Sequence, residues 1–231
     1  MTGRRHHQEA AATPGGEGRF EGYDVMAQSP LWDPVTAAVV RGRVAQERAL
    51  AFFTPEEAEI CRALLGLVLA NHEAPRVPVL EMVDQRLFEG ETDGWRYEDM
   101  PEDGEAWHQT LRFLDEDAAE AFGAGFARCT GDQQARLVQG VQDSDTWHGL
   151  PGGHVWSLWT RYACAAFYAH PWAWNEIGFG GPAYPRGYKV LHPGWREPWE
   201  VAERAAADPV PWSHRVEEAR RAHEVRLGGQ A

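Results

Sequence analysis

The chain has 231 residues, 43% of them hydrophobic, and a formal net charge of −13. This length and composition suit one large domain, with or without extended arms. The negative charge argues against nucleic acid as a partner, because a polyphosphate backbone requires a basic surface. No run of eighteen apolar residues occurs in the sequence, so we expect no membrane span.

The three cysteines, Cys61, Cys129 and Cys164, are far apart and form no C-x-x-C pair. This spacing does not favour a zinc ribbon, a haem-attachment site or a disulfide framework. Cys61 and Cys164 fall within apolar helical patterns, and we predict that both are small core residues.

Residues 1–19 combine glycine, alanine and charge without periodicity, so they are predicted to form a disordered N-terminal arm. Arg4 and Arg5 lie in this arm, but the apolar stretch that a twin-arginine export signal needs does not follow them. We therefore expect a cytoplasmic protein, with a periplasmic location only if a partner chain escorts it.

Two helix starts are marked by capping boxes, in which Thr54 pairs with Glu57 and Thr130 pairs with Gln133. Apolar residues at helical spacing indicate the other helices, and Pro171 ends the last of them because the residue before a proline leaves the α region. The predicted helices run from Pro34 to about Arg43, from Pro55 onward, from about Val79 to Phe88, from about Gly104 to Phe122, onward from Thr130, and from about His154 to His170.

No convincing series of strands appears, so the predicted fold is all-α, an irregular helical bundle of about five to seven helices with long ordered loops and N- and C-terminal arms. The segments 15–35, 143–153 and 171–200 show no regular period, and loops of this length are usually functional or ordered by a partner. The predicted organisation is an arm at 1–19, a helical domain at 20–197 and a helical C-terminal tail at 198–231.

Catalytic motifs are few. The glycines of Gly178–Gly181 lack the strand before and the helix after them that a dinucleotide loop requires, and no G-x-S-x-G elbow occurs. A set of imidazole and carboxylate groups in the C-terminal half is the alternative, because it could bind a divalent metal. Its members are His148, His154, His170 and Glu176. No pair among them has H-x-x-x-H or H-x-x-E spacing, which favours histidines that serve the structure.

Tryptophan is the strongest compositional signal, since seven of the eleven lie within residues 147–199. Trp156 and Trp159 fit the core face of the last predicted helix. Trp172, Trp174, Trp195 and Trp199 fit a core less well, because they lie in segments rich in proline and glycine. Indoles combine a large apolar area with one N–H donor and are enriched at interfaces.

The order of these elements resembles the gluconate 2-dehydrogenase subunit 3 family from about Phe52 to Tyr188. The stretches that carry the resemblance are FFTPEEAEICRALLGLVLAN, PRVPVLEMVDQRL and FYAHPWAWNEIGFGGPAYPRGY. The closing motif is the most specific, and it is matched by Asn175, Ile177–Gly178, Gly180–Gly181 and Tyr184–Pro185.

The resemblance implies a non-catalytic small subunit of an oxidoreductase complex. Its large partner would be an FAD-dependent flavoprotein of the glucose–methanol–choline type that oxidises a sugar, sugar acid or polyol. Some such complexes add a membrane-bound cytochrome c. The resemblance implies no cofactor in this chain and no catalytic residue, and the export signal usual in the family is absent from this sequence.

We therefore predict a small subunit that binds and stabilises or matures this flavoprotein, with the aromatic segment 169–188 as the contact. The predicted partner-binding residues are Trp172, Trp174, Asn175, Glu176, Phe179, Tyr184 and Tyr188. For Asn175 and Glu176, hydrogen bonds to backbone N–H groups of the same segment are an equal alternative. The alternative function is a self-standing metal-dependent enzyme that uses the histidine set.

Overall fold

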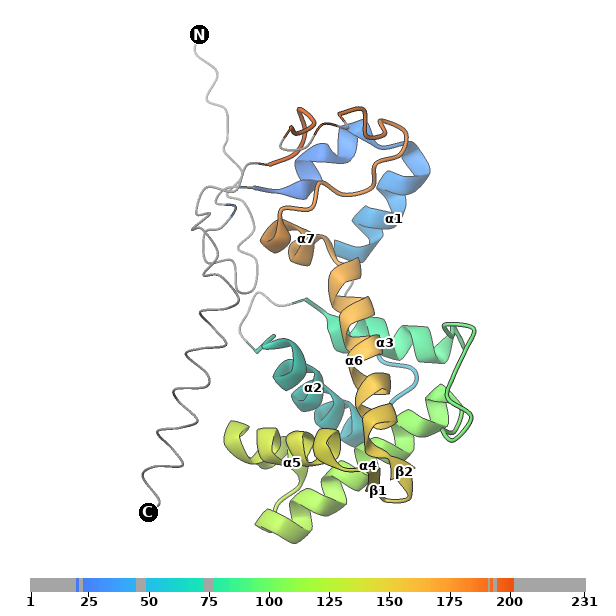
Figure 1. Cartoon of the computed structure of the whole chain (residues 1–231), viewed down its shortest axis with the longest axis vertical. Coiled ribbons are helices and arrows are strands. Elements are labelled where there is room, and N and C mark those ends of the chain that lie inside the picture. Colours follow the sequence, from blue (N-terminus) through green and yellow to red (C-terminus); the bar gives the residue numbers. More distant parts are fainter. Residues whose placement is uncertain are drawn as a thin grey trace.

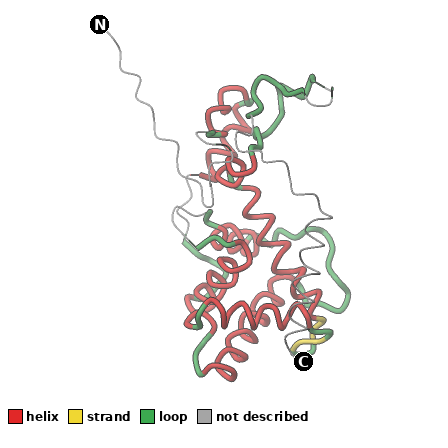
Figure 2. Tube along the Cα trace, turned by 60° about the vertical axis from the view of Figure 1, so that its left-hand side comes forward, coloured by secondary structure: helices red, strands yellow, loops and turns green. Residues whose placement is uncertain are grey.

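The computed structural model of the protein describes residues 20, 23–44, 49–72, 77–190, 192 and 195–201. This part of the chain is all-α apart from one two-stranded hairpin, which confirms the predicted fold class (Figure 2). The predicted arm at 1–19 and nearly all of the predicted tail at 198–231 lie outside the described residues.

Five helices pack into what we call the bundle, the described residues of 49–170 (Figure 1). They are α2 (Pro55–Leu69), α3 (Val79–Phe88), α4 (Asp103–Phe122), α5 (Gly131–Asp143) and α6 (Gly152–Ala169), with the short 3-10 helix η2 (Phe126–Arg128) between α4 and α5.

Local sequence signals fix several of these helix starts. Both capping boxes form: Thr54 Oγ1 accepts the Glu57 N–H at 3.2 Å, and the second box has the same reciprocal bonds. The approach to α2 is held from α3 by Asp84, a buried carboxylate that accepts the N–H groups of Ala51, Phe52 and Phe53 at 2.7, 3.0 and 2.9 Å.

The core of the bundle contains the largest fully buried side chains, among them Trp107, Trp159 and Tyr162. Trp159 Nε1 donates to Thr110 Oγ1 at 3.1 Å, so this indole is satisfied inside the core. Cys61 is buried as predicted. The prediction for Cys164 is wrong, because the side chain lies on the exposed face of α6.

The segment 143–153, predicted to be irregular, contains an antiparallel hairpin of β1 (Thr146–Trp147) and β2 (Leu150–Pro151). Its two turn residues, His148 and Gly149, have φ of +47° and +82°. Two successive positive φ values match the twist of paired strands, and α6 begins directly after the hairpin.

The second part of the molecule, which we call the cap, comprises the described residues of 20–44 and 171–201. It contains η1 (Val25–Leu31), α1 (Pro34–Val44) and α7 (Pro171–Ile177), and has a small core of its own. That core is formed by Val25, Trp32, Ala37, Val40 and Trp174. In Figure 1, α6 runs from the hairpin at the bottom of the bundle to α7 in the cap.

The N-terminal half of the cap is ordered by two aspartates. Asp24 Oδ1 accepts the Met26 N–H at 2.9 Å and begins η1, in a region predicted to be irregular. Asp33 Oδ1 accepts the N–H groups of Val35 and Thr36 at 3.0 and 3.2 Å, so Asp33 caps the start of α1.

Candidate docking surface

The first part of the predicted partner-binding segment is helix α7 and not an irregular loop. Pro171 follows the end of α6, as predicted, but it also occupies the first position of α7, where a missing N–H costs nothing. His170 is the N-cap, because its Nδ1 accepts the Trp172 N–H at 3.2 Å. Gly178, with φ of +67°, ends α7 in the left-handed conformation.

His170 is 1% exposed, and burial lowers its pKa to about 4. The imidazole is therefore neutral at pH 7, which is the form whose Nδ1 can accept a hydrogen bond. Next to it, Arg43 Nη1 donates to the Ala169 carbonyl at 3.0 Å and ties α1 to the end of α6. The junction between the bundle and the cap thus depends on an uncharged histidine.

Trp174 and Asn175 already have their partners inside this chain. Trp174 is 4% exposed, packs against Trp32 in the core of the cap, and donates from Nε1 to the Tyr168 carbonyl at 2.6 Å. Asn175 Oδ1 accepts the Val25 N–H at 2.7 Å. These two predicted partner-binding residues hold the N-terminal half of the cap against α7.

Trp172 and Glu176 are only partly buried. Trp172 packs against the bundle core and meets the His170 ring edge to face, with the ring centroids 5.0 Å apart. Glu176 Oε1 is buried without a hydrogen-bond partner among the described residues, and burial raises the pKa of this carboxyl. A buried acceptor without a partner costs free energy, so this carboxyl does not support the predicted role in binding a partner.

After α7 the chain crosses the cap as a strap, which we define as residues 178–190. The Arg186 guanidinium lies 3.6 Å from the centroid of the Trp199 ring and fixes the strap on one side. The buried carboxylate of Glu197 accepts the Val190 N–H at 2.6 Å and fixes its end. The strap therefore has a defined path although it has no regular secondary structure.

Close packing explains why the strap is rich in glycine. Gly181 has a φ of +74°, and a Cβ there would lie 2.5 Å from the Trp32 ring. Beside it, the Tyr23 hydroxyl donates to the Phe179 carbonyl at 3.2 Å, and burial raises the pKa of Tyr23 to about 12, so that this donor keeps its proton. The glycines let the backbone lie directly on the core of the cap, which turns the large side chains outward.

The outward side chains form what we call the strap surface. Of the predicted partner-binding residues, Phe179, Tyr184 and Tyr188 belong to it, with 40%, 70% and 50% of their area exposed. The structure adds two residues that the sequence did not single out for this role, Ile177 at 51% and Trp195 at 70%. Exposed aromatic side chains of this size are enriched at protein interfaces.

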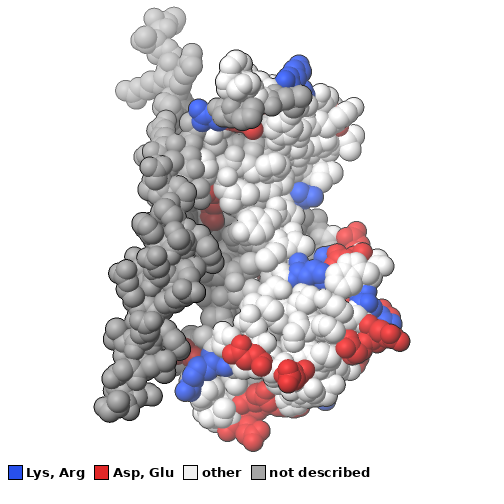
Figure 3. Space-filling view, in the orientation of Figure 1, with Lys and Arg blue, Asp and Glu red and all other residues white. Residues whose placement is uncertain are grey.

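The cap and the bundle also differ in charge. The described residues of the cap include five acidic and five basic side chains, whereas those of the bundle include 20 acidic and seven basic ones, a net charge of −13. On the face in Figure 3, acidic groups cover the bundle at the bottom and the cap at the top is mainly uncharged. Because interface centres are depleted of charge, the cap is the better docking surface.

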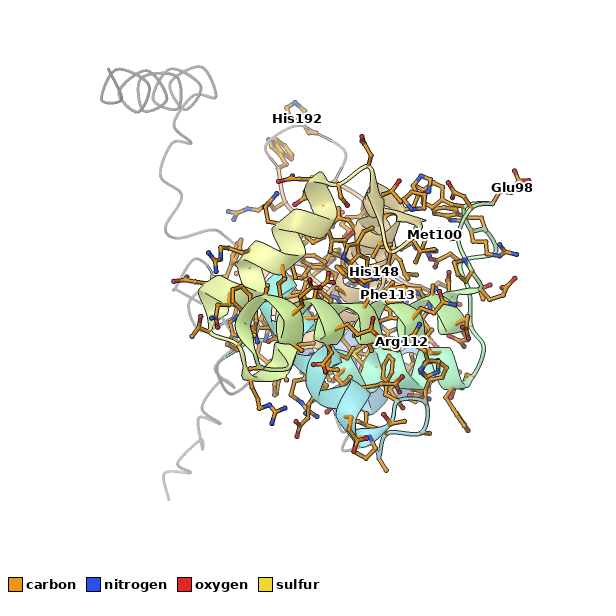
Figure 4. All side chains as sticks on the ribbon, turned by 90° about the horizontal axis from the view of Figure 1, so that it is seen from below. Glu98, Met100, Arg112, Phe113, His148 and His192 are labelled. Carbon is orange, nitrogen blue, oxygen red and sulfur yellow. The ribbon has the colours of Figure 1, made fainter. Side chains whose placement is uncertain are left out.

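The four residues of the alternative metal site do not come together. In the bundle, His148 Nε2 lies 2.7 Å from Asp117 Oδ1 and its ring stacks on Phe113 (Figure 4), while His154 Nδ1 lies 2.8 Å from Asp99 Oδ1. The other two members lie beyond the far end of α6: His170 is the N-cap of α7, and Glu176 is in the last turn of α7. Within the described residues no three histidine, cysteine or acidic side chains gather to hold a metal.

Sequence reasoning also missed the exposed apolar face of α1. Val35, Val39 and Val44 are exposed by 73%, 53% and 37%, and Leu31, just before α1, by 48%. The signal was present, because the stretch PVTAAVV is apolar on every side of a helix and such a helix is normally covered all round.

Comparison with known proteins identifies a family. Residues 55–181, more than half of the chain, match the sequence family described as Gluconate 2-dehydrogenase subunit 3, from the start of α2 into the strap. No curated protein and no solved structure matches the chain. None of the helices in the described ranges is long and apolar enough to cross a membrane. The chain therefore belongs to the gluconate 2-dehydrogenase subunit 3 family.

Proposed function

We propose that this protein is a non-catalytic accessory subunit that binds, stabilises and helps to mature a large FAD-dependent dehydrogenase. The family description makes its members subunits of a gluconate 2-dehydrogenase, which supports an accessory role in such a complex. The large subunit would be a glucose–methanol–choline-type flavoprotein that oxidises a sugar, sugar acid or polyol. In this proposal FAD and the catalytic residues belong to the large subunit.

The strap surface is the observation that carries the proposal. Five large apolar side chains project from an ordered and nearly charge-balanced part of the molecule, while the bundle below carries the negative charge. Burying such groups against another protein removes apolar area from water at roughly 25 cal/mol per Å² before the costs of association.

A subunit of this kind acts by mass action. A protein that binds only the folded, FAD-loaded large subunit raises the free energy of unfolding of that subunit. The gain grows with the logarithm of the concentration of the small subunit relative to Kd. In this proposal the complex forms in the cytoplasm and reaches the periplasm only if the large subunit carries an export signal. A cytochrome c could join it there as the electron acceptor.

Affinity purification from the native source tests the proposal. A tagged copy of the chain should retain a flavoprotein in a fixed ratio, with FAD identified by its absorbance and fluorescence after release. Removing the chain should lower the amount of folded, FAD-loaded large subunit. A tagged chain that emerges alone and monomeric, from cells that make it at its natural level, would contradict the proposal.

A further inference from the structure

A groove separates the cap from the bundle on the side formed by α1, α3 and α6. It has a volume of about 540 Å³. Much of its lining comes from small residues, which are Ala38 and Gly42 on α1 and Ala165, Ala166 and Ala169 on α6. Small side chains on two helices leave room for a third backbone to approach closely.

The arginine and tyrosine side chains that line the groove are already engaged within the chain. Arg43 donates to a backbone carbonyl at the end of α6, Arg86 forms an ion pair with Asp93, and the Tyr162 hydroxyl donates to Asp103 Oδ2 at 2.7 Å. A small polar ligand would have to break these bonds to gain its own. The groove therefore offers shape and apolar area, which suits side chains of a protein partner better than a sugar or an anion.

Helix α1 supplies the strongest sign that the groove is covered. Only Ala37 and Val40 of this helix are buried in the chain, although its first two turns, Pro34–Val40, have a single polar residue, Thr36. The uncovered side of these turns includes Val39, which lines the groove and is 53% exposed. Helical turns that are apolar on every side are normally covered.

The shape of the groove and its charge define the occupant. Its walls are helices, and the described sheet is limited to the hairpin Thr146–Pro151, so an extended segment would find no strand to pair with here. A helix satisfies its own backbone and fits such a site. On the α3 side the rim carries the exposed carboxylates Glu89 and Glu91, part of a bundle with a net charge of −13. Charge complementarity therefore calls for a basic flank.

We propose that the groove between α1, α3 and α6 is a second docking site, which receives an apolar helix of the large flavoprotein subunit flanked by arginine or lysine. This inference rests on the proposed function, because it takes the large subunit as the partner. It adds a contact separate from the strap surface, and together the two sites hold the partner across the junction of cap and bundle.

Filling the groove from Gly42 tests this site. A Cβ at Gly42 would meet no atom within 4 Å, so Gly42→Leu leaves the free chain folded and places a side chain where the partner helix would lie. Gly140→Leu is the matched control, since Gly140 lies on α5 of the bundle and has the same open surroundings. With the co-purified flavoprotein as the probe, Gly42→Leu should weaken binding at least about tenfold, and Gly140→Leu should bind like the wild type.

A charge reversal provides a second test that does not depend on filling the groove. Glu89→Lys combined with Glu91→Lys should also weaken binding at least about tenfold, and the loss should shrink at high salt. The control is Glu116→Lys with Glu120→Lys, two exposed positions on α4. Circular dichroism and the melting temperature of each free variant establish that it is folded.

A photo-crosslinking residue in place of Val39 identifies the occupant. The proposal predicts crosslinks to a large-subunit segment that has apolar residues beside arginine or lysine. Crosslinks to residues 202–231 of this chain, or to a second copy of it, would overturn the groove assignment. Binding as tight as the wild type by both the Gly42→Leu and the Glu89/Glu91 variants would also overturn the groove assignment. The proposed function would still stand in that case. If the wild-type chain retains no flavoprotein, the proposed function fails and the groove proposal fails with it.

Discussion

The bundle and the cap both have buried aromatic cores but differ in charge. In the bundle, Trp107 and Trp159 are fully buried and the outer surface carries the acidic charge. In the cap, two buried indoles, Trp32 and Trp174, organise a small core while Tyr184 and Trp195 are each 70% exposed. The bundle has a large core of its own and carries the net charge, whereas the described part of the cap presents large exposed apolar groups without a net charge. This difference supports the proposal that the bundle is the scaffold and the cap is the contact.

The largest expected effect comes from Trp174→Ala. Removing this buried indole empties the core of the cap and should cost about 3–5 kcal/mol of cap stability. Because the bundle has its own core, it should stay folded. Hydrogen exchange checks this: the Val25 N–H, bonded to Asn175, should lose its protection while amides of α2 keep theirs. Loss of protection in both parts together would show that the two are a single cooperative unit.

Asp84→Ala should have the next largest effect, and this effect should be a loss of stability in the bundle. It leaves three backbone N–H groups without their acceptor, so the free energy of unfolding should fall by about 3 kcal/mol. Chemical denaturation measures this. Asp99→Ala, which removes an exposed partner of His154, is the control and should cost less than about 1 kcal/mol. Equal losses for the two variants would mean that Asp84 does not organise the entry to α2.

A smaller effect is expected from pH at the junction of cap and bundle. The pKa of His170 is about 4 in the folded chain and 6.5 ordinarily, so the unfolded chain binds a proton first as the pH falls. The contribution of His170 is therefore complete above about pH 6.5 and is lost progressively down to about pH 4, at a cost of about 2–3 kcal/mol. His170→Asn keeps a capping oxygen but does not titrate.

A comparison of the wild type with His170→Asn separates the titration of His170 from that of the many carboxylates. The pH dependence of unfolding between pH 6.5 and 4 should be shallower for His170→Asn than for the wild type, with the difference arising in the cap. Identical slopes would contradict a buried neutral histidine at the junction.

The features that sequence predicted well depend on neighbouring residues. The boundaries of α3 and the capping boxes at Thr54 and Thr130 follow from residues within one helical turn. Helix α7 was missed because its N-cap is a histidine and because Pro171 looks like a stop when only the preceding helix is considered. The hairpin was missed because a histidine, His148, adopts a positive φ.

The sequence marked the aromatic segment 169–188 but not which of its side chains are exposed. The aromatic segment does lie on the surface, but nothing local separates Trp174, which is buried, from Tyr184, which is exposed. The difference is made by Val25 and Trp32, about 150 positions earlier in the chain. Such distant contacts appear only once the chain is folded, and they turned an apparent docking tryptophan into the core of the cap.

The central claim is that the cap docks the large flavoprotein through the strap surface. The most direct test is the affinity of the purified large subunit for the double variant Tyr184→Ser/Trp195→Ser, beside Trp95→Ser as an exposed aromatic of the bundle. We expect the double variant to melt within about 2 °C of the wild type, since surface changes of this kind alter stability little. Its affinity should fall at least about tenfold while the Trp95 variant stays within about twofold. A double variant that binds as tightly as the wild type would contradict the account.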